Sequence, residues 1–169
     1  MRRSFYLLIV ISLCCLFAWA QEPTSSTPKM SDTKPSKTMV YVYRYKQFVG
    51  SALTPSVYCD DTQLARIENG RYFTANLEPG KHTFTSNDKQ SGLDLDLKAG
   101  QEYFIRVELV AGFAKGHGRL VLVPREQGIY ELKSDKLKPL DANKVANKDV
   151  VSLDEPHLLT TALEESKKQ

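Results

Sequence analysis

The loop around His117 has residue types and spacing that could bind an anion. It reads G-F-A-K-G-H-G-R from Gly112 to Arg119, so that glycines alternate with Lys115, His117 and Arg119. Backbone N–H groups in such a turn can form a concavity for anions, and the flanking cations would add charge. The segment is not a P-loop, because G-x-x-x-x-G-K-[ST] is absent. The alternative is a hairpin loop whose glycines only meet positive φ requirements.

The other reactive side chains lack partners for catalysis in the sequence. His82 follows a Pro-Gly turn and His157 lies near the C-terminus, so neither has an adjacent nucleophile and orienting group. Cys59 has no neighbouring cation, and the two aspartates after it oppose formation of a thiolate. We therefore expect Cys59 to be a small buried residue. The sequence predicts no catalytic residue and no enzyme activity.

No metal or cofactor is predicted from the ligand spacing. Asp94 and Asp96 alternate on one strand face without the further oxygen ligands of a calcium loop. Zinc would need several cysteine or histidine ligands close together, whereas His82 and His117 are isolated and Cys59 has no partner cysteine.

An aromatic stripe follows the first expected strand. The alternation from Met39 to Tyr45 places Tyr41, Tyr43 and Tyr45 on one face. Exposed, the stripe could stack on a sugar or a peptide, whereas a second sheet or a C-terminal helix could equally cover it. The candidate ligand-binding residues are therefore Lys115, His117, Arg119, Tyr41 and Tyr43, and the expected partner is an envelope protein or a glycan.

The N-terminal 20 residues have the features of a cleaved signal peptide. Arg2 and Arg3 precede an apolar run from Phe5 to Phe17, and Ala18-Trp19-Ala20 is an A-x-A cleavage site. The run is shorter than the roughly 20 residues that span a bilayer, so no stable membrane span is expected after cleavage. We expect an exported protein, periplasmic or secreted. Residues 21–38 are rich in Pro, Ser, Thr and Lys and are expected to form a disordered linker.

Charge argues against nucleic acid as a partner. The formal net charge of +3 falls by two when Arg2 and Arg3 leave with the signal peptide. The remaining chain is nearly neutral and lacks the positive field of a nucleic-acid-binding protein.

Residues 39–140 are expected to form an all-β domain. Short alternating runs separated by turn residues predict seven or eight antiparallel strands in a β-sandwich. Within it, 71–77 and 81–86 read as the two arms of a hairpin closed by Pro79 and Gly80. Residues 129–132 read as the last strand.

The remaining residues, 141–169, are expected to form a polar loop and a short helix. Ser152-Leu-Asp-Glu155 matches a capping box, and the apolar residues at 158, 159, 162 and 163 form a helical stripe. Such a short helix is marginal alone and needs the domain or a partner to stabilise it.

Several motifs lie between Met39 and Leu140, namely V-Y-V-Y-R-Y-K at Val40, V-Y-C-D-D at Val57, L-A-R-I-E-N-G-R-Y-F at Leu64, L-E-P-G-K-H-T-F at Leu77 and L-K-A-G-Q-E-Y-F-I-R-V-E at Leu97. Together they resemble an uncharacterised bacterial family, domain of unknown function 2846. Asp60-Asp61 stands where such modules commonly have Asp-Gly. The resemblance implies an exported or envelope-associated β-rich domain and no established activity. The chain is also similar, more weakly, to surface-layer β-sandwich modules named for a Pro-Glu-Gly-Ala motif.

The function expected from these observations is a non-catalytic binding or accessory module of the cell envelope. Two alternatives remain open. One is a hydrolytic or ligand-modifying enzyme that uses the His117 loop, and the other is a subunit that docks on a larger assembly through its C-terminal helix.

Overall fold

The computed structural model describes residues 37–87, 92–110, 117–134 and 136–156. The predicted signal peptide, the linker up to residue 36, Lys115, His157 and the expected helical stripe lie outside these residues. Among the residues that are described, no helix is long and apolar enough to cross a membrane.

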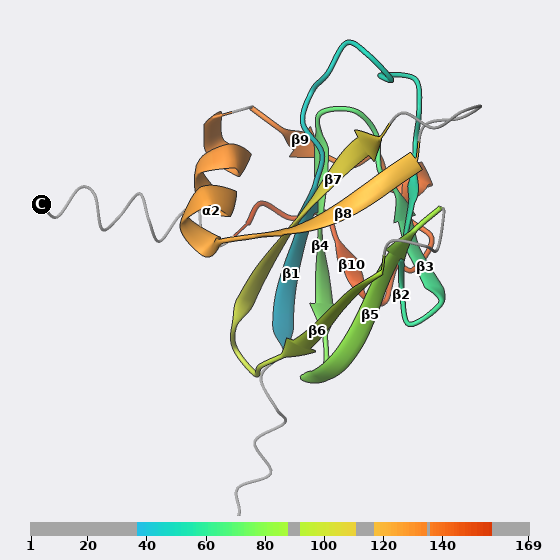
Figure 1. Ribbon diagram of the computed structural model, residues 1–169. Helices are drawn as coiled ribbons and strands as arrows, with labels where there is room; N and C mark the ends of the chain where they lie inside the picture. Colours follow the sequence, from blue (N-terminus) through green and yellow to red (C-terminus); the bar gives the residue numbers. More distant parts are fainter. Residues whose placement is uncertain (1–36, 88–91, 111–116, 135, 157–169) are drawn as a thin grey trace, which may run out of the picture. The chain divides into compact units, whose positions relative to one another are not determined.

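Two β-sheets make up the described part of the chain (Figure 1). The first has the order β10-β4-β1-β7-β8, with β9 also paired to β4, and the second has the order β3-β2-β5-β6. The strands of the first sheet are β1 (Thr38–Tyr43), β4 (Arg71–Leu77), β7 (Glu102–Val110), β8 (His117–Val123), β9 (Lys138–Pro139) and β10 (Val151–Ser152). Those of the second are β2 (Ser56–Cys59), β3 (Thr62–Arg66), β5 (Gly80–Ser86) and β6 (Leu93–Leu97). The helices of the described residues are α2 (Arg125–Ser134) and the short 3₁₀ turn η1 (Ala142–Lys144).

An apolar core lies between the two sheets, as expected of a sandwich. It combines inward side chains of the first sheet with inward side chains of the second, among them Val40, Val42, Phe73, Ile105, Val57, Phe84 and Leu97. Burial of these side chains is the main favourable term in the folding of such a domain. The predicted two-sheet, mostly β architecture is confirmed.

The alternation of β1 is also confirmed. Val40 and Val42 face the core between the sheets, whereas Tyr41 and Tyr43 belong to a second cluster on the opposite face of the first sheet. This second cluster packs against α2 through Leu132. The alternation therefore positions the tyrosines under a helix rather than between the sheets.

The sheets are not wholly antiparallel, which corrects the expected arrangement. β1 runs parallel to β7, with Val42 opposite Ile105, and β9 runs parallel to β4. Alternation along a strand reports which face is buried and carries no information on the direction of the neighbouring strand. Parallel pairing was therefore not visible in the sequence.

The predicted hairpin around Pro79 and Gly80 is wrong. β4 pairs with β1, whereas β5 pairs with β2 and β6, so the turn carries the chain from one sheet to the other. Gly80 has a φ of 143°, a backbone conformation that residues other than glycine rarely adopt. The Pro-Gly pair does reverse the chain, but both arms face the same core from opposite sheets.

The turn after Cys59 does close a tight hairpin. β2 pairs antiparallel with β3, with Cys59 opposite Thr62. Asp60 and Asp61 both have positive φ, 49° and 63°, as a two-residue turn of type I′ requires. Aspartate tolerates this left-handed conformation better than most residues, so the turn forms without the usual glycine.

The last expected strand, 129–132, is instead part of α2. The segment after Pro124 carries Arg, Glu, Gln, Leu and Lys, which favour a helix, and Glu126 lies in its first turn. Gly128 was read as a strand separator, but it lies inside the helix with its N–H bonded to the carbonyl of Pro124 at 2.8 Å. A close approach to Phe104 of the sheet explains why a glycine lies at this helical position.

The folded region continues past the expected boundary at Leu140. Leu140 and Val151 are buried, and β10 pairs with β4 through Val151 and Ser152. Between them, Val145 forms a bridge with Ala65 of β3, at the edge of the second sheet. Ser152 therefore ends a strand instead of capping a helix, and residues 153–156 are not helical.

Candidate functional site

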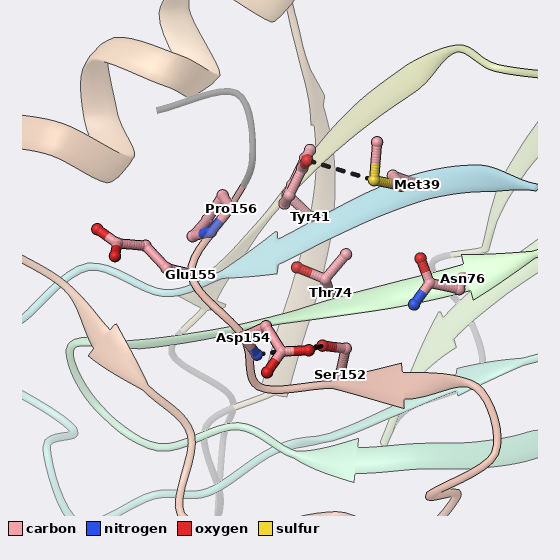
Figure 2. A pocket seen from close by; sticks show the side chains of 8 residues that line it. All are labelled: Met39, Tyr41, Thr74, Asn76, Ser152, Asp154, Glu155 and Pro156. Carbon is pink, nitrogen blue, oxygen red and sulfur yellow. Dashed lines mark hydrogen bonds between the residues drawn. The ribbon is translucent and has the colours of Figure 1, made fainter. Parts of the chain in front are cut away.

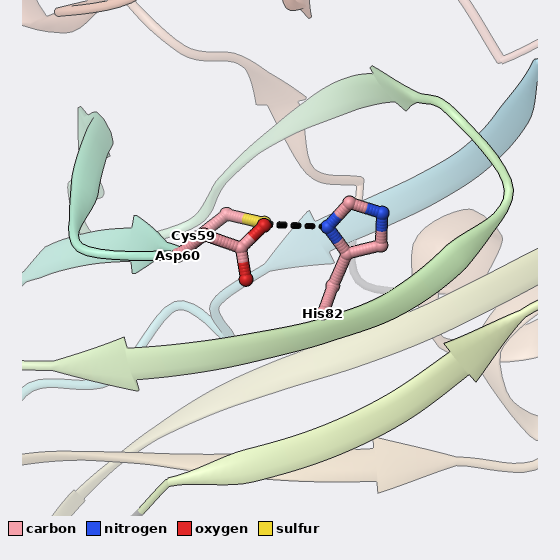
Figure 3. A group of neighbouring side chains, drawn as sticks. All are labelled: Cys59, Asp60 and His82. Atoms are coloured by element: carbon pink, nitrogen blue, oxygen red, sulfur yellow. Dashed lines mark hydrogen bonds and ion pairs between the residues drawn. The ribbon is translucent and has the colours of Figure 1, made fainter.

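Three side chains of different chemistry meet at one end of the second sheet (Figure 3). Cys59 ends β2, Asp60 begins the turn to β3, and His82 lies on β5. They meet because β2 and β5 are neighbours in register, with Cys59 opposite Phe84. We call Cys59, Asp60 and His82 the Cys-Asp-His cluster.

Asp60 and His82 form a short ion pair, with Oδ2 and Nδ1 2.6 Å apart. The other ring nitrogen, Nε2, donates to the backbone carbonyl of Glu78 at 2.9 Å. Since both ring nitrogens face acceptors, an imidazolium satisfies both hydrogen bonds. Burial alone would raise the pKa of Asp60, but the N–H of Thr83 and the hydrogen bond with His82 outweigh it and hold that pKa below its ordinary value.

Cys59 lies beside this pair but is not activated by it. Its Sγ is 3.7 Å from His82 Nδ1 and 3.6 Å from Asp60 Oδ2. Burial and the charge of Asp60 raise the pKa of the thiol to about 12. A nucleophilic cysteine needs a lowered pKa, so the cluster is unsuited to thiolate catalysis.

The expectation that Cys59 and His82 have no partners is therefore wrong. Each contacts Asp60, and the three ligand atoms lie within 4.8 Å of one another. Sequence spacing could not show this, because 23 residues separate the cysteine from the histidine and the pairing of β2 with β5 brings them together. Among the described residues, this cluster has a composition that could hold a metal ion.

The structure places two of the predicted anion-binding residues at the start of β8. His117 is exposed and lies opposite Val110 of β7. Arg119 lies opposite Glu108, and its guanidinium forms an ion pair with that carboxylate. Because Lys115 lies outside the described residues, the described part of this loop offers one exposed histidine and an arginine that already has a partner.

The two predicted ligand-stacking tyrosines are buried. Tyr41 is 1 % exposed and stacks on Phe104 with ring centroids 5.0 Å apart. Tyr43 is fully buried, and its hydroxyl donates to the carboxylate of Glu131 on α2. The stripe is therefore covered, as one of the two interpretations anticipated, and the cover is α2 rather than a second sheet or a C-terminal helix.

The edge of Tyr41 lines a shallow pocket of about 220 Å³ on the outer face of the first sheet (Figure 2). The Tyr41 hydroxyl donates to the sulfur of Met39 at 3.6 Å. Across the pocket, the hydroxyl of Ser152 bonds to Asp154. The hydroxyls of Tyr41 and Ser152 at this pocket are thus already engaged in hydrogen bonds.

An exposed apolar surface lies at the other end of β1, on the loop of residues 44–55. Phe48 is 97 % exposed and Val49 is 83 % exposed, with Leu53 and Val110 of β7 beside them. We call Phe48, Val49, Leu53 and Val110 the apolar loop surface. Sequence reasoning missed it, although K-Q-F-V-G in a region without alternation was a visible signal.

A buried arginine holds this loop in shape. Arg44, 1 % exposed, donates from its guanidinium to the backbone carbonyls of Gly50 and Leu53. Its Nε has no hydrogen-bond partner among the described residues, and burial lowers the pKa of the group. Burying a guanidinium that bonds only to carbonyls costs free energy. The rest of the fold must offset this cost to keep the loop in its conformation.

Comparison with known proteins supports the family suggested by the sequence motifs. A family model described as a protein of unknown function, DUF2846, matches residues 34–118. The chain is also similar to an uncharacterized protein of Haemophilus influenzae (strain ATCC 51907 / DSM 11121 / KW20 / Rd). The two are 28% identical over 123 residues, which cover 71% of this chain and 73% of that protein. No solved structure matches the chain.

Proposed function

The chain belongs to the DUF2846 family, and from this premise we propose that it is an exported, non-catalytic β-sandwich that binds a protein of the bacterial cell envelope. The observation that carries the proposal is the apolar loop surface, with Phe48 97 % exposed on a loop that buried Arg44 holds.

The exposed apolar side chains of Phe48 and Val49 lie next to Leu53 and to Val110 of β7. Single exposed apolar residues are common on protein surfaces, whereas contiguous exposed apolar patches mark interaction sites. Phe48 and Val49 contribute nothing to the core, whereas Leu109 contacts the loop near Gly50 and supports it from β7. A preorganised loop loses little conformational entropy on binding, which favours recognition by a rigid protein surface.

The first 20 residues support the export part of the proposal, through their charged start, apolar run and A-x-A site. The non-catalytic part rests on the chemistry of the described clusters. The Cys59 thiol has a raised pKa, and Arg119 is paired with Glu108. Neither arrangement provides an activated nucleophile with a base.

Site-specific photo-crosslinking in cells tests the proposed contact. A benzophenone-bearing phenylalanine analogue replaces Phe48 in one version of the full chain and Tyr130 in a matched control. Tyr130 is also aromatic and is 70 % exposed, but it lies on α2. We expect a discrete adduct of one envelope protein from position 48, diminished by excess unmodified protein, and none from position 130.

A second variant distinguishes a protein contact from a lipid contact. Phe48→Ser combined with Val49→Ser should keep the free energy of unfolding within about 0.5 kcal/mol of the parent, because both side chains are exposed. It should also abolish co-purification of the crosslinked partner. Equal crosslinking from both positions, or binding of the parent but not the variant to protein-free lipid vesicles, would contradict a protein-binding role.

A further inference from the structure

We propose that the Cys-Asp-His cluster binds a divalent transition-metal cation of the zinc type. Cys59 Sγ, Asp60 Oδ2 and His82 Nδ1 lie within 4.8 Å of one another. Thiolate, imidazole and carboxylate are the three protein ligands that zinc takes, and three of them with an open fourth position form a known type of zinc coordination. The site lies in the second sheet and does not include the apolar loop surface.

Two of the three distances between the ligand atoms match those expected around a tetrahedral zinc ion. Sγ is 3.6 Å from Asp60 Oδ2 and 3.7 Å from His82 Nδ1. Zinc bonds are about 2.3 Å long to sulfur and about 2.0 Å long to nitrogen or oxygen. At tetrahedral angles, these lengths place the sulfur roughly 3.5 Å from each nitrogen or oxygen ligand atom. The third distance, 2.6 Å between Asp60 Oδ2 and His82 Nδ1, must increase by somewhat less than an ångström when a cation binds. That contact is a hydrogen bond, which a cation would replace.

The groups around the cluster already orient its ligands. His82 Nε2 donates to the carbonyl of Glu78, which leaves Nδ1 directed at the cluster. Asp60 Oδ1 accepts the N–H of Thr83, which leaves Oδ2 directed at the same point. Metal-bound histidines typically donate their other ring nitrogen to a carbonyl or carboxylate, and bound carboxylates are held by a further hydrogen bond.

Accessibility allows a cation to enter from one side. Cys59 is buried, the His82 side chain is 16% exposed and the Asp60 side chain is 51% exposed. A cation would approach from solvent past Asp60 and bind the Cys59 sulfur on its buried side. A water molecule on its exposed side would be the fourth ligand. The positive charge would also be placed beside an existing carboxylate.

Binding requires the loss of protons and no change of oxidation state. The Cys59 thiol is protonated at neutral pH, because burial and Asp60 raise its pKa to about 12. As the metal–sulfur bond forms, the Sγ–H proton leaves to solvent, and the Nδ1–H proton of His82 leaves as the metal–nitrogen bond forms. The competing explanation is a purely structural clip, in which Asp60 and His82 only tie the turn to β5.

Cobalt substitution and mass measurement distinguish these two explanations. The full-length gene product, processed by the cell and carrying a tag without histidine, is stripped with a chelator and titrated with Co²⁺ and then Zn²⁺. We expect one cation per chain by native mass spectrometry. A thiolate-to-cobalt charge-transfer band and tetrahedral visible bands should appear with Co²⁺ and disappear when Zn²⁺ displaces it.

Matched variants locate the site. Cys59→Ser should abolish the charge-transfer band. Loss of a group that only orients a metal ligand weakens binding roughly 10–100-fold, so His82→Gln, which removes a ligand, should weaken it by at least that much. His117→Gln, at an exposed histidine of β8, should bind as the parent does. If either cluster variant fails to fold, Asp60→Asn changes an exposed turn residue and should weaken binding in the same way.

Two results would overturn the proposal. One is a parent protein that takes up neither cation, even though its cluster variants melt at lower temperature, which is the signature of a structural clip. The other is uptake that survives both Cys59→Ser and Asp60→Asn, which would place the cation elsewhere. A rise in melting temperature with Zn²⁺ in the parent and in His117→Gln, absent from Cys59→Ser, supports it.

Discussion

At the scale of single residues, Glu131 on α2 is held by several hydrogen bonds at once. Its side chain is 8% exposed and receives hydrogen bonds from Arg106 at 2.9 Å, from Gln127 at 2.7 Å and from the hydroxyl of Tyr43. Arg106 also pairs with Glu108 and lies 5.4 Å from the ring centre of Tyr45. A buried carboxylate with this many donors fixes α2 on the sheet in one orientation.

The charge of Glu131 should make stability depend on pH in the acid range. Burial alone would raise the pKa of Glu131, but hydrogen bonds from the tyrosines, Gln127 and Arg106 outweigh it and lower that pKa below 4.5. Because the folded-state pKa is the lower one, this stabilisation is complete above roughly pH 4.5 and is lost as the pH falls through the folded-state value.

Glu131→Gln should therefore lower the free energy of unfolding by about 1–3 kcal/mol at neutral pH. It should also make that free energy depend less on pH in the acid range. Urea unfolding followed by circular dichroism between neutral and acid pH measures both effects. Glu126→Gln, in the exposed first turn of the same helix, is the control. A variant at Glu131 with parental stability and parental pH dependence would show that the carboxylate does not anchor α2.

The sequence predicted which residues point inward far better than it predicted which residues meet. Val40 and Tyr41 were assigned to opposite faces of β1 correctly, because alternation is a local property. The contact between Asp60 and His82 and that between Tyr43 and Glu131 depend on strand order and on the position of α2. Those are long-range features that no local spacing encodes.

At the scale of elements, α2 is docked through a glycine. A Cβ added to Gly128 would lie 2.4 Å from atoms of the Phe104 ring, closer than any real contact. The helix therefore approaches β7 more closely than any other residue would allow. This explains a glycine inside a helix, where it lowers helix propensity by about 1 kcal/mol relative to alanine.

Gly128→Ala should destabilise the protein by about 1–3 kcal/mol despite the better helix propensity of alanine, because it overpacks the Phe104 contact. Gly92→Ala is the matched control, since its Cβ would meet only methyl groups of Thr83 and Thr85 at 3.7 and 3.8 Å. Urea unfolding of both variants measures the difference. Equal stability of the two would mean that α2 can shift away from Phe104 at little cost.

Most strands were predictable as elements, but their neighbours were not. The alternation of Asp94 and Asp96 on one face of β6 was recognised, and Leu95 and Leu97 on the other face are buried. A Pro-Gly turn reverses the chain in the same way whether its arms share a sheet or face one another across a core, so β4 and β5 were paired wrongly. The end of α2 was misread because four residues with Ile and Tyr resemble a strand when taken alone.

At the scale of the whole described fold, the segment from β9 to β10 ties the two sheets together. β9 and β10 pair with β4 of the first sheet, whereas Ala146 and Asn147 donate backbone hydrogen bonds to Leu64 of the second. Its polar composition concealed this role, because the contacts are made by the backbone and by a few apolar residues.

A chain that ends at Leu140 should therefore be much less stable than one that ends at Pro156. The shorter chain loses β10 and the burial of Val151, which alone contributes about 1.5–3 kcal/mol, together with the bridge of Val145 to Ala65. Urea unfolding of the two truncated chains and the full chain measures the loss. Equal stability of all three would show that the fold is complete at the boundary expected from the sequence.

The position of β1 determines how the protein would transmit a pull. The chain enters the fold at Thr38, β1 ends at Tyr43, and the loop with the apolar surface begins at the next residue, Arg44. Tension between the N-terminal side of β1 and a partner bound at Phe48 would run along β1 and the first residues of that loop. A strand is already close to the greatest extension of a polypeptide, so it offers almost no slack. Apart from β7, which contributes Val110 to the same surface, the other strands would lie outside this load path.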